Sequence, residues 1–135
     1  MPGIKTDMFE LGYAIANGDM SAIDIKVDNK SRVAIAGVSL GYPGDYGSAK
    51  SKQIFGLEYA MRVSGVQLYG AGVRVENGRY YANGGRLFYI VGEGSDIMEA
   101  REKAYHAMSL VSMEGDKLHY RKNIGWRDVA RLKRE

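Results

Sequence analysis

The chain has 135 residues, of which 45% are hydrophobic, enough for one ordinary core but too few for two comfortable domains. It has no cysteine, which excludes a disulfide scaffold, a thiolate zinc site and a cysteine nucleophile, and fits a reducing cytoplasmic location. Its net charge of +3 is spread over 19 basic and 16 acidic residues, and no apolar run approaches membrane length. We therefore expect a single domain over residues 1–135, cytoplasmic and without a membrane partner.

Only the C-terminal end of the chain has a clear excess of basic over acidic residues. Such a basic cluster is either a nucleic-acid footprint or a solvated tail. No aromatic stacking motif and no recognised nucleic-acid module accompany it, so we favour the tail. A stand-alone small binding module for nucleic acid is the alternative. The cluster comprises Arg121, Lys122, Arg127, Arg131, Lys133 and Arg134.

The first predicted element is a short amphipathic helix near the N-terminus. Asp7 and Glu10 have the spacing of a capping box, and Met8, Leu11 and Ile15 recur at helical spacing. Residue 18 is a glycine, which would end the helix. The residues before Asp7 carry no turn or cap signal, so the beginning resembles a cut in a longer protein.

A strand is predicted over residues 32–40, with small or apolar residues on both faces, as in a strand that is covered on both sides. It ends in a rigid turn over residues 41–46, where Pro43 and Gly44 lie between Tyr42 and Tyr46. These tyrosines either close over a ligand or only cover the end of the strand.

The next elements surround Asn77-Gly78, the pair that most favours a tight hairpin turn, between residues 66–76 and 79–82. The hairpin leads into Asn83-Gly84-Gly85-Arg86 and then the apolar run 87–91, which predicts a buried strand. Adjacent glycines bring bare backbone close to a ligand, and an arginine suits phosphate or carboxylate. Arg86 either binds such an anion or pairs with a neighbouring acidic side chain.

The last part of the chain predicts a long helix, a short strand and a buried tryptophan. Asp96 and Glu99 form a second capping-box pair, and a strand is expected over residues 118–120. Trp126 is interpreted as a core residue rather than a stacking platform. The core face of the helix is predicted from Ile97, Ala100, Ala104, Met108 and Val111.

Most catalytic signatures are missing or incomplete. The run 37–41 matches the elbow of serine hydrolases around Ser39, but a proline turn follows where that motif needs a helix. His106 and His119 are isolated, which argues against a metal site. There is no phosphate-binding loop that ends in Lys-Ser or Lys-Thr. What remains is an anion-binding pattern in two glycine-rich turns, 41–44 and 84–86, at the ends of two strands that could lie side by side.

The order and spacing of several short motifs resemble the C-terminal domain of phosphoribosylamine-glycine ligase, also called glycinamide ribonucleotide synthetase, of the ATP-grasp family. The resemblance runs from Lys5 to Asp128. The chain departs from the family pattern at Gly70, Ala82 and Asn123. The motifs are Gly41-Tyr42-Pro43-Gly44, Tyr46, Ile54, Gly56-Leu57, Ala71-Gly72, Asn83-Gly84-Gly85-Arg86, Glu99-Ala100, Ala104-Tyr105, Arg121 and Ile124-Gly125.

This resemblance implies an ATP-dependent ligase of purine biosynthesis. Glycine would first be phosphorylated to glycyl phosphate, and the amine of 5-phosphoribosylamine would then attack it, releasing ADP and phosphate. ATP and Mg, or Mn, would bind to an ATP-grasp domain that is missing here, so this chain alone should be inactive and supply no catalytic or metal-binding residue. It would pack on the N-terminal and ATP-grasp domains of the same enzyme.

The resemblance also implies a substrate-binding role for Arg86 with Gly84 and Gly85. The turn that contains Tyr42, Pro43 and Gly44 is carried over as a second substrate-binding element, or as a surface that packs on the preceding domain. The fold class that we expect is α+β, with a small antiparallel sheet, one long packed helix and a short N-terminal helix.

Overall fold

The computed structural model describes residues 2–132. Its internal contacts divide the chain into two compact units, Met1–Lys30 and Ser31–Glu135, and each is described here by itself. The prediction of a single domain over the whole chain stays a prediction. Within the described range, no helix has both the length and the apolar character needed to cross a membrane.

The first unit contains helix α1 (Met8–Ala16). The Asp7 carboxylate accepts hydrogen bonds from the backbone N–H of Phe9 at 2.7 Å and of Glu10 at 3.1 Å, so the predicted N-cap is confirmed. Leu11 is buried, as expected, but Ile15 is 62% exposed, so the predicted apolar face is only partly buried.

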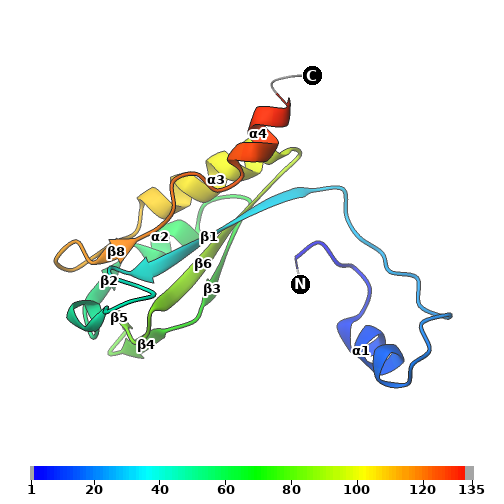
Figure 1. Cartoon of the computed structure of the whole chain (residues 1–135), viewed down its shortest axis with the longest axis horizontal. Coiled ribbons are helices and arrows are strands. Elements are labelled where there is room, and N and C mark those ends of the chain that lie inside the picture. Colours follow the sequence, from blue (N-terminus) through cyan, green and yellow to red (C-terminus); the bar gives the residue numbers. More distant parts are fainter. Residues whose placement is uncertain (1, 133–135) are drawn as a thin grey trace. The chain divides into compact units, whose positions relative to one another are not determined.

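The second unit contains two four-stranded antiparallel sheets, with strand orders β3-β6-β1-β8 and β4-β5-β2-β7. Figure 1 shows the long strands β1 and β6 side by side. The α+β class is confirmed. The elements are β1 (Ser31–Ser39), η1 (Gly47–Ala49), β2 (Gln53–Phe55), α2 (Leu57–Met61), β3 (Val66–Gly70), β4 (Val73–Glu76), β5 (Arg79–Ala82), β6 (Arg86–Gly94), α3 (Ile97–Ser109), β7 (Ser112–Met113), β8 (Leu118–His119) and α4 (Trp126–Leu132).

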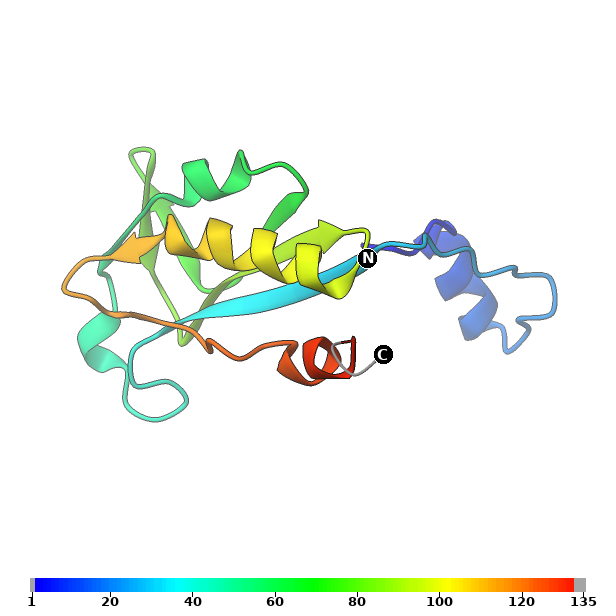
Figure 2. The ribbon, with the colours of Figure 1, turned by 90° about the horizontal axis from the view of Figure 1, so that it is seen from above.

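Helix α3 covers one face of the first sheet, where it lies across β1 and β6 (Figure 2). A Cβ atom at Gly92 would lie 2.2 Å from the Ala100 carbonyl oxygen, so glycine allows the strand and the helix to approach closely. Along β1 the buried side chains alternate, with Val33 and Ile35 buried and Ala34 exposed. The prediction that β1 is covered on both sides is therefore wrong, because only the face toward α3 is fully covered.

The hairpin prediction is confirmed. Asn77 has φ 48° and Gly78 has φ 73°, the pair of positive values that a type I′ turn requires. The predicted strand 66–76 is divided at Ala71-Gly72, because β3 joins the first sheet and β4 the second. The chain thus passes from the first sheet to the second at the pair of small residues Ala71-Gly72.

The long helix α3 begins at the predicted cap. The Asp96 side chain accepts a hydrogen bond from the Glu99 backbone N–H at 2.9 Å, and Glu99 accepts from both the backbone and the hydroxyl of Ser95. The Lys103 ammonium donates to Glu99 at 2.6 Å, and this bond together with those from Ser95 lowers the pKa of Glu99 from 4.5 to about 2.

The core of this unit is one cluster formed between the sheets and α3. The prediction for Trp126 is wrong: its side chain is 53% exposed, because it begins α4, a helix with no buried residue. The sequence also did not predict α2, α4, β2 or β7 as separate elements. The fully buried large side chains of the cluster are Ile35, Ile54, Leu87, Phe88, Ile90 and Met108.

Candidate functional site

The two glycine-rich turns meet where β1 ends and β6 begins. The Ser39 backbone N–H donates to the Gly85 carbonyl, and the Ser39 hydroxyl donates to the Gly84 carbonyl, each at 2.8 Å. The expectation that these turns lie side by side is confirmed. Ser39 is fully buried and joins the two strand ends, so it has a structural role rather than that of an exposed nucleophile.

Tyr42 packs directly on the backbone of Gly85. A Cβ atom at Gly85 would lie 2.1 Å from Cδ2 of the Tyr42 ring, and Gly85 itself is buried. Glycine at position 85 therefore makes room for a tyrosine of this chain. Gly84 is half-buried, while Pro43 and Gly44 are exposed in the turn that follows Tyr42.

The chain around Gly84 is also held by the turn at Ala71-Gly72. The Asn83 backbone N–H donates to the Gly72 carbonyl at 2.8 Å, and the Gly72 N–H donates to the Arg86 carbonyl at 2.9 Å. A Cβ atom at Gly72 would lie 2.6 Å from that same Arg86 carbonyl oxygen. These contacts fix the backbone from which the Arg86 side chain projects.

Arg86 is the first residue of β6, and its side chain is exposed. Among residues 2–132 it forms no ion pair, so the alternative of a structural acidic partner is not observed there. The register pairs Val38 with Arg86 on one side and with His119 on the other. Directly paired residues project from the same face of a sheet, so Val38 and His119 both face away from α3. The pairing of Val38 with Arg86 follows a register shift at Gly37, where Leu87 and Phe88 are both buried, and the exposed Arg86 side chain then projects on the side of Val38.

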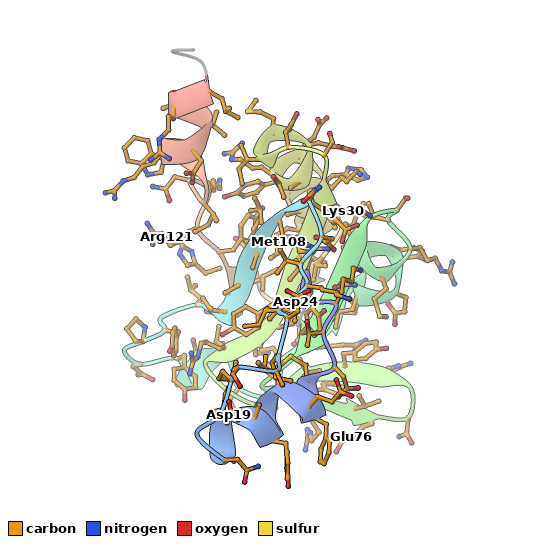
Figure 3. The ribbon with its side chains drawn as sticks, turned by 90° about the vertical axis from the view of Figure 1, so that its right-hand side faces the viewer. Asp19, Asp24, Lys30, Glu76, Met108 and Arg121 are labelled. Carbon is orange, nitrogen blue, oxygen red and sulfur yellow. The ribbon has the colours of Figure 1, made fainter. Side chains whose placement is uncertain are left out.

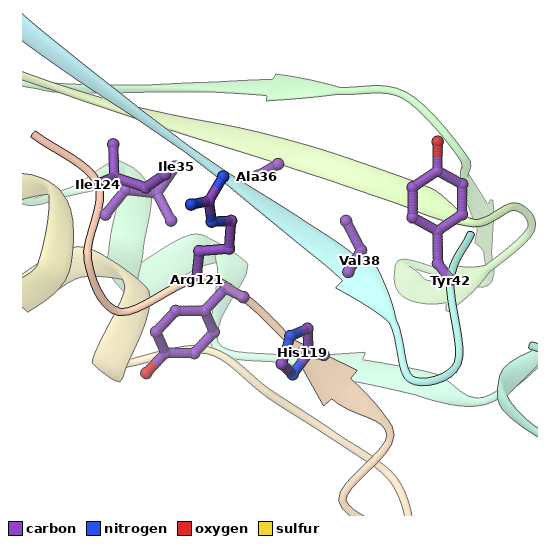
Figure 4. A pocket seen from close by; sticks show the side chains of 8 residues that line it. Ile35, Ala36, Val38, Tyr42, His119, Arg121 and Ile124 are labelled. Carbon is purple, nitrogen blue, oxygen red and sulfur yellow. The ribbon is translucent and has the colours of Figure 1, made fainter. Parts of the chain in front are cut away.

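A cavity of about 240 Å³ lies beside this row, between β1 and the chain that follows β8. Figure 4 shows Arg121 extending toward Ala36 of β1, with His119 and Tyr42 further along the strand. In Figure 3, Arg121 lies at the outer edge of the unit, whereas Met108 points into its interior. The cavity is lined by Ile35, Ala36, Val38, Tyr42, His119, Tyr120, Arg121 and Ile124.

Two residues of α3 hold the segment that carries Arg121. The Tyr105 hydroxyl donates to the Arg121 carbonyl at 2.8 Å and accepts from the Ile124 N–H at 3.0 Å. Arg101 donates to the Ile124 carbonyl at 3.0 Å, and its guanidinium lies 4.7 Å from the centre of the Tyr105 ring. The backbone of residues 121–124 is therefore anchored on the rigid helix.

Sequence reasoning placed Arg86 at the end of a strand but did not group it with His119 or Arg121. Arg121 was noticed only in the terminal basic cluster and in the family motif, and His119 was considered only as an isolated histidine without a site around it. The described part of the chain holds no group of three or more His, Asp or Glu side chains arranged to bind a metal ion.

Comparisons with known proteins agree on one family. Residues 32–127 match the family model described as phosphoribosylglycinamide synthetase, C domain. The chain is 36% identical over 124 residues to the phosphoribosylamine–glycine ligase of Caldanaerobacter subterraneus, covering 92% of this chain and 28% of that protein. It is 34% identical to the enzyme of the same name from Archaeoglobus fulgidus, covering 93% of this chain and 27% of the relative.

A solved structure is also similar. The crystal structure of phosphoribosylamine–glycine ligase from Thermotoga maritima matches with a TM-score of 0.57 and 25% identity, covering 78% of this chain and 25% of the other. The chain thus spans about a quarter of the length of these relatives. With most of its second unit matched by the family model, the chain belongs to the phosphoribosylglycinamide synthetase C-domain family.

Proposed function

We propose that this chain is the C-terminal domain of a phosphoribosylamine–glycine ligase. The whole ligase would join glycine to 5-phosphoribosylamine through glycyl phosphate, converting ATP to ADP and phosphate. The family match and the named relatives support this. ATP and Mg, or Mn, would be held by an ATP-grasp domain outside this chain. A cytoplasmic location stays a prediction, and no comparison supports the nucleic-acid alternative.

Within the ligase, this domain would close one side of the active site and bind the phosphate of 5-phosphoribosylamine through Arg86. The observation that carries this role is an exposed guanidinium without an ion pair in the described structure, on backbone fixed by Gly72 and Gly84. Gly85 is buried under the Tyr42 ring, so we propose that these two residues support the start of β6 and do not contact substrate there. Pro43 and Gly44 remain accessible for contact with substrate or with a preceding domain.

Exposed apolar side chains support the expectation that other domains of the ligase cover this chain. In the first unit, the rings of Phe9 and Tyr13 stack with centroids 6.3 Å apart, and Phe9 is 80% exposed. Exposed aromatic surface of this kind marks interaction sites. We propose that the N-terminal and ATP-grasp domains of the same polypeptide pack there.

The experiment is steady-state kinetics of the full-length ligase with Arg86→Ala. A charge-assisted hydrogen bond contributes about 1.5 to 3 kcal/mol, so kcat/KM for phosphoribosylamine should fall about tenfold to a hundredfold while the KM for ATP stays unchanged. Arg62→Ala, at an exposed arginine after α2, is the matched control. An unchanged kcat/KM for phosphoribosylamine would remove the role of Arg86.

A further inference from the structure

We propose that Arg121 and the cavity beside it complete the anion site of Arg86, so that two guanidiniums bind the phosphate while the sugar lies in the cavity against Val38 and Tyr42. This inference deepens the proposed function and rests on it. It assigns a ligand-binding role to a residue that the sequence marked only as part of the terminal basic cluster and of a family motif.

The first support is position. Val38 pairs with both Arg86 and His119, and Arg121 follows His119 by two residues. Because neighbouring strands lie about 4.8 Å apart, the backbones at Arg86 and His119 are separated by about 10 Å. Arg121 lies two residues further along and extends toward Ala36 (Figure 4), so it is offset from Arg86 along β1 as well as across it. Two extended arginine side chains on the same side of β1 can converge on one phosphate between them.

The second support is charge. Like Arg86, Arg121 is exposed and forms no ion pair with any carboxylate of the described chain. The Tyr105 hydroxyl donates to the backbone carbonyl of Arg121 and not to its side chain, so the Arg121 guanidinium is available to a ligand. A phosphate monoester carries a charge of about −1.5 to −2 at neutral pH, which two arginines can match.

The third support is the size and lining of the cavity. Its volume of about 240 Å³ is below the range of about 300–1,000 Å³ that is typical of pockets for drug-sized ligands. Its floor is apolar, and polar groups of Tyr42, His119 and Arg121 lie along it. An apolar floor with a few polar groups and a cation fits a small phosphorylated sugar better than a nucleotide.

The fourth support is rigidity. Exposed arginines on mobile tails are poor binding groups because each contact must overcome the entropy of ordering the chain. Here Tyr105 and Arg101 make three hydrogen bonds of 2.8–3.0 Å to the backbone of Arg121 and Ile124. The segment that carries Arg121 is therefore ordered before any ligand binds.

The test is a double-mutant cycle in the full-length ligase with Arg86→Ala, Arg121→Ala and both together. The probe is ribose 5-phosphate, which carries the phosphate and sugar but not the reacting amine, and its Kd is measured by calorimetry. We expect each single variant to weaken binding about tenfold or more. The double variant should weaken it by clearly less than the product of the two single effects, because both residues contact one phosphate.

Lys122→Ala is the matched control, since it removes an adjacent exposed cation outside the cavity lining. The inference is overturned if Arg121→Ala binds ribose 5-phosphate like the parent enzyme, if Lys122→Ala weakens binding equally, or if the two arginine effects multiply. Failure of the proposed function is seen separately, as a parent enzyme that forms no product from glycine, ATP and phosphoribosylamine.

Discussion

The two faces of the first sheet differ in what they contact. On the face toward α3, Ile35, Phe88 and Ile90 are fully buried, and Gly92 touches the helix backbone. On the opposite face, Tyr69 is 43% exposed and Arg86 projects without an ion pair within residues 2–132. Side chains alternate between the two faces along β1, and along β6 from Phe88 onward, so adjacent residues there have different surroundings.

This contrast separates stability from recognition. A substitution on the covered face should lower the free energy of unfolding because it leaves a cavity or a clash in close-packed surroundings. A substitution on the open face should leave the fold in place and change what binds there.

The largest expected effect is that of Phe88→Ala. Removing a fully buried ring beside Gly37 should lower the free energy of unfolding by about 3–5 kcal/mol. The matched control is Tyr69→Ala on the open face, for which we expect a loss below about 1 kcal/mol. Denaturant unfolding measures both. Equal losses would show that the two faces contribute alike to stability.

An intermediate effect is expected for Tyr105→Phe, which removes the hydroxyl that links α3 to residues 121–124. The lost hydrogen bonds should cost about 1–3 kcal/mol of unfolding free energy. If Tyr105 positions Arg121, the KM for phosphoribosylamine should also rise several-fold in the full-length ligase, with the KM for ATP unchanged.

Tyr59→Phe, at an exposed tyrosine of α2, is the control for that substitution. A loss of stability without any change in the KM for phosphoribosylamine would limit Tyr105 to a structural role. It would also show that the site tolerates movement of the segment that carries Arg121.

The smallest effect concerns pH and Glu99 at the start of α3. Its pKa is lowered to about 2 by Lys103 and Ser95, so its stabilisation is complete above the ordinary value of 4.5 and is lost as the pH falls through about 2. Glu99→Gln should therefore lower the unfolding midpoint at pH 7, and the difference from the parent chain should shrink below pH 4.5.

Glu102→Gln, on the same helix, is the control for Glu99. The midpoints of all three chains are compared by circular dichroism at pH 7 and near pH 2. A difference between the parent chain and Glu99→Gln that is the same at both values would show that Glu99 does not stabilise the helix through its charge.

Local signals in the sequence predicted the elements with strong patterns. Asp7 and Asp96 were placed correctly as helix caps, and Asn77-Gly78 as a tight hairpin. These signals work because a cap or turn depends on residues a few positions apart. Trp126 was misplaced, since burial of a single aromatic residue depends on what packs against it.

The candidate site was predicted in part. Arg86 and the proximity of the two glycine turns followed from strand ends and glycine pairs. The sequence did not predict why residue 85 must be a glycine, because only the fold brings the Tyr42 ring against the Gly85 backbone. The place of Arg121 beside β1 was also not predicted, since its neighbours on that strand are far away along the chain.

The sequence by itself determined the caps, the hairpin turn, the α+β class and the family resemblance, because all of these depend on local or ordered patterns of residues. The tertiary structure alone decided which face of the sheet is covered, why Gly85 must lack a side chain, and that Arg86 and His119 flank Val38 beside the cavity lined by Arg121. Strand register and packing between distant segments set those relations, and no short stretch of sequence encodes them.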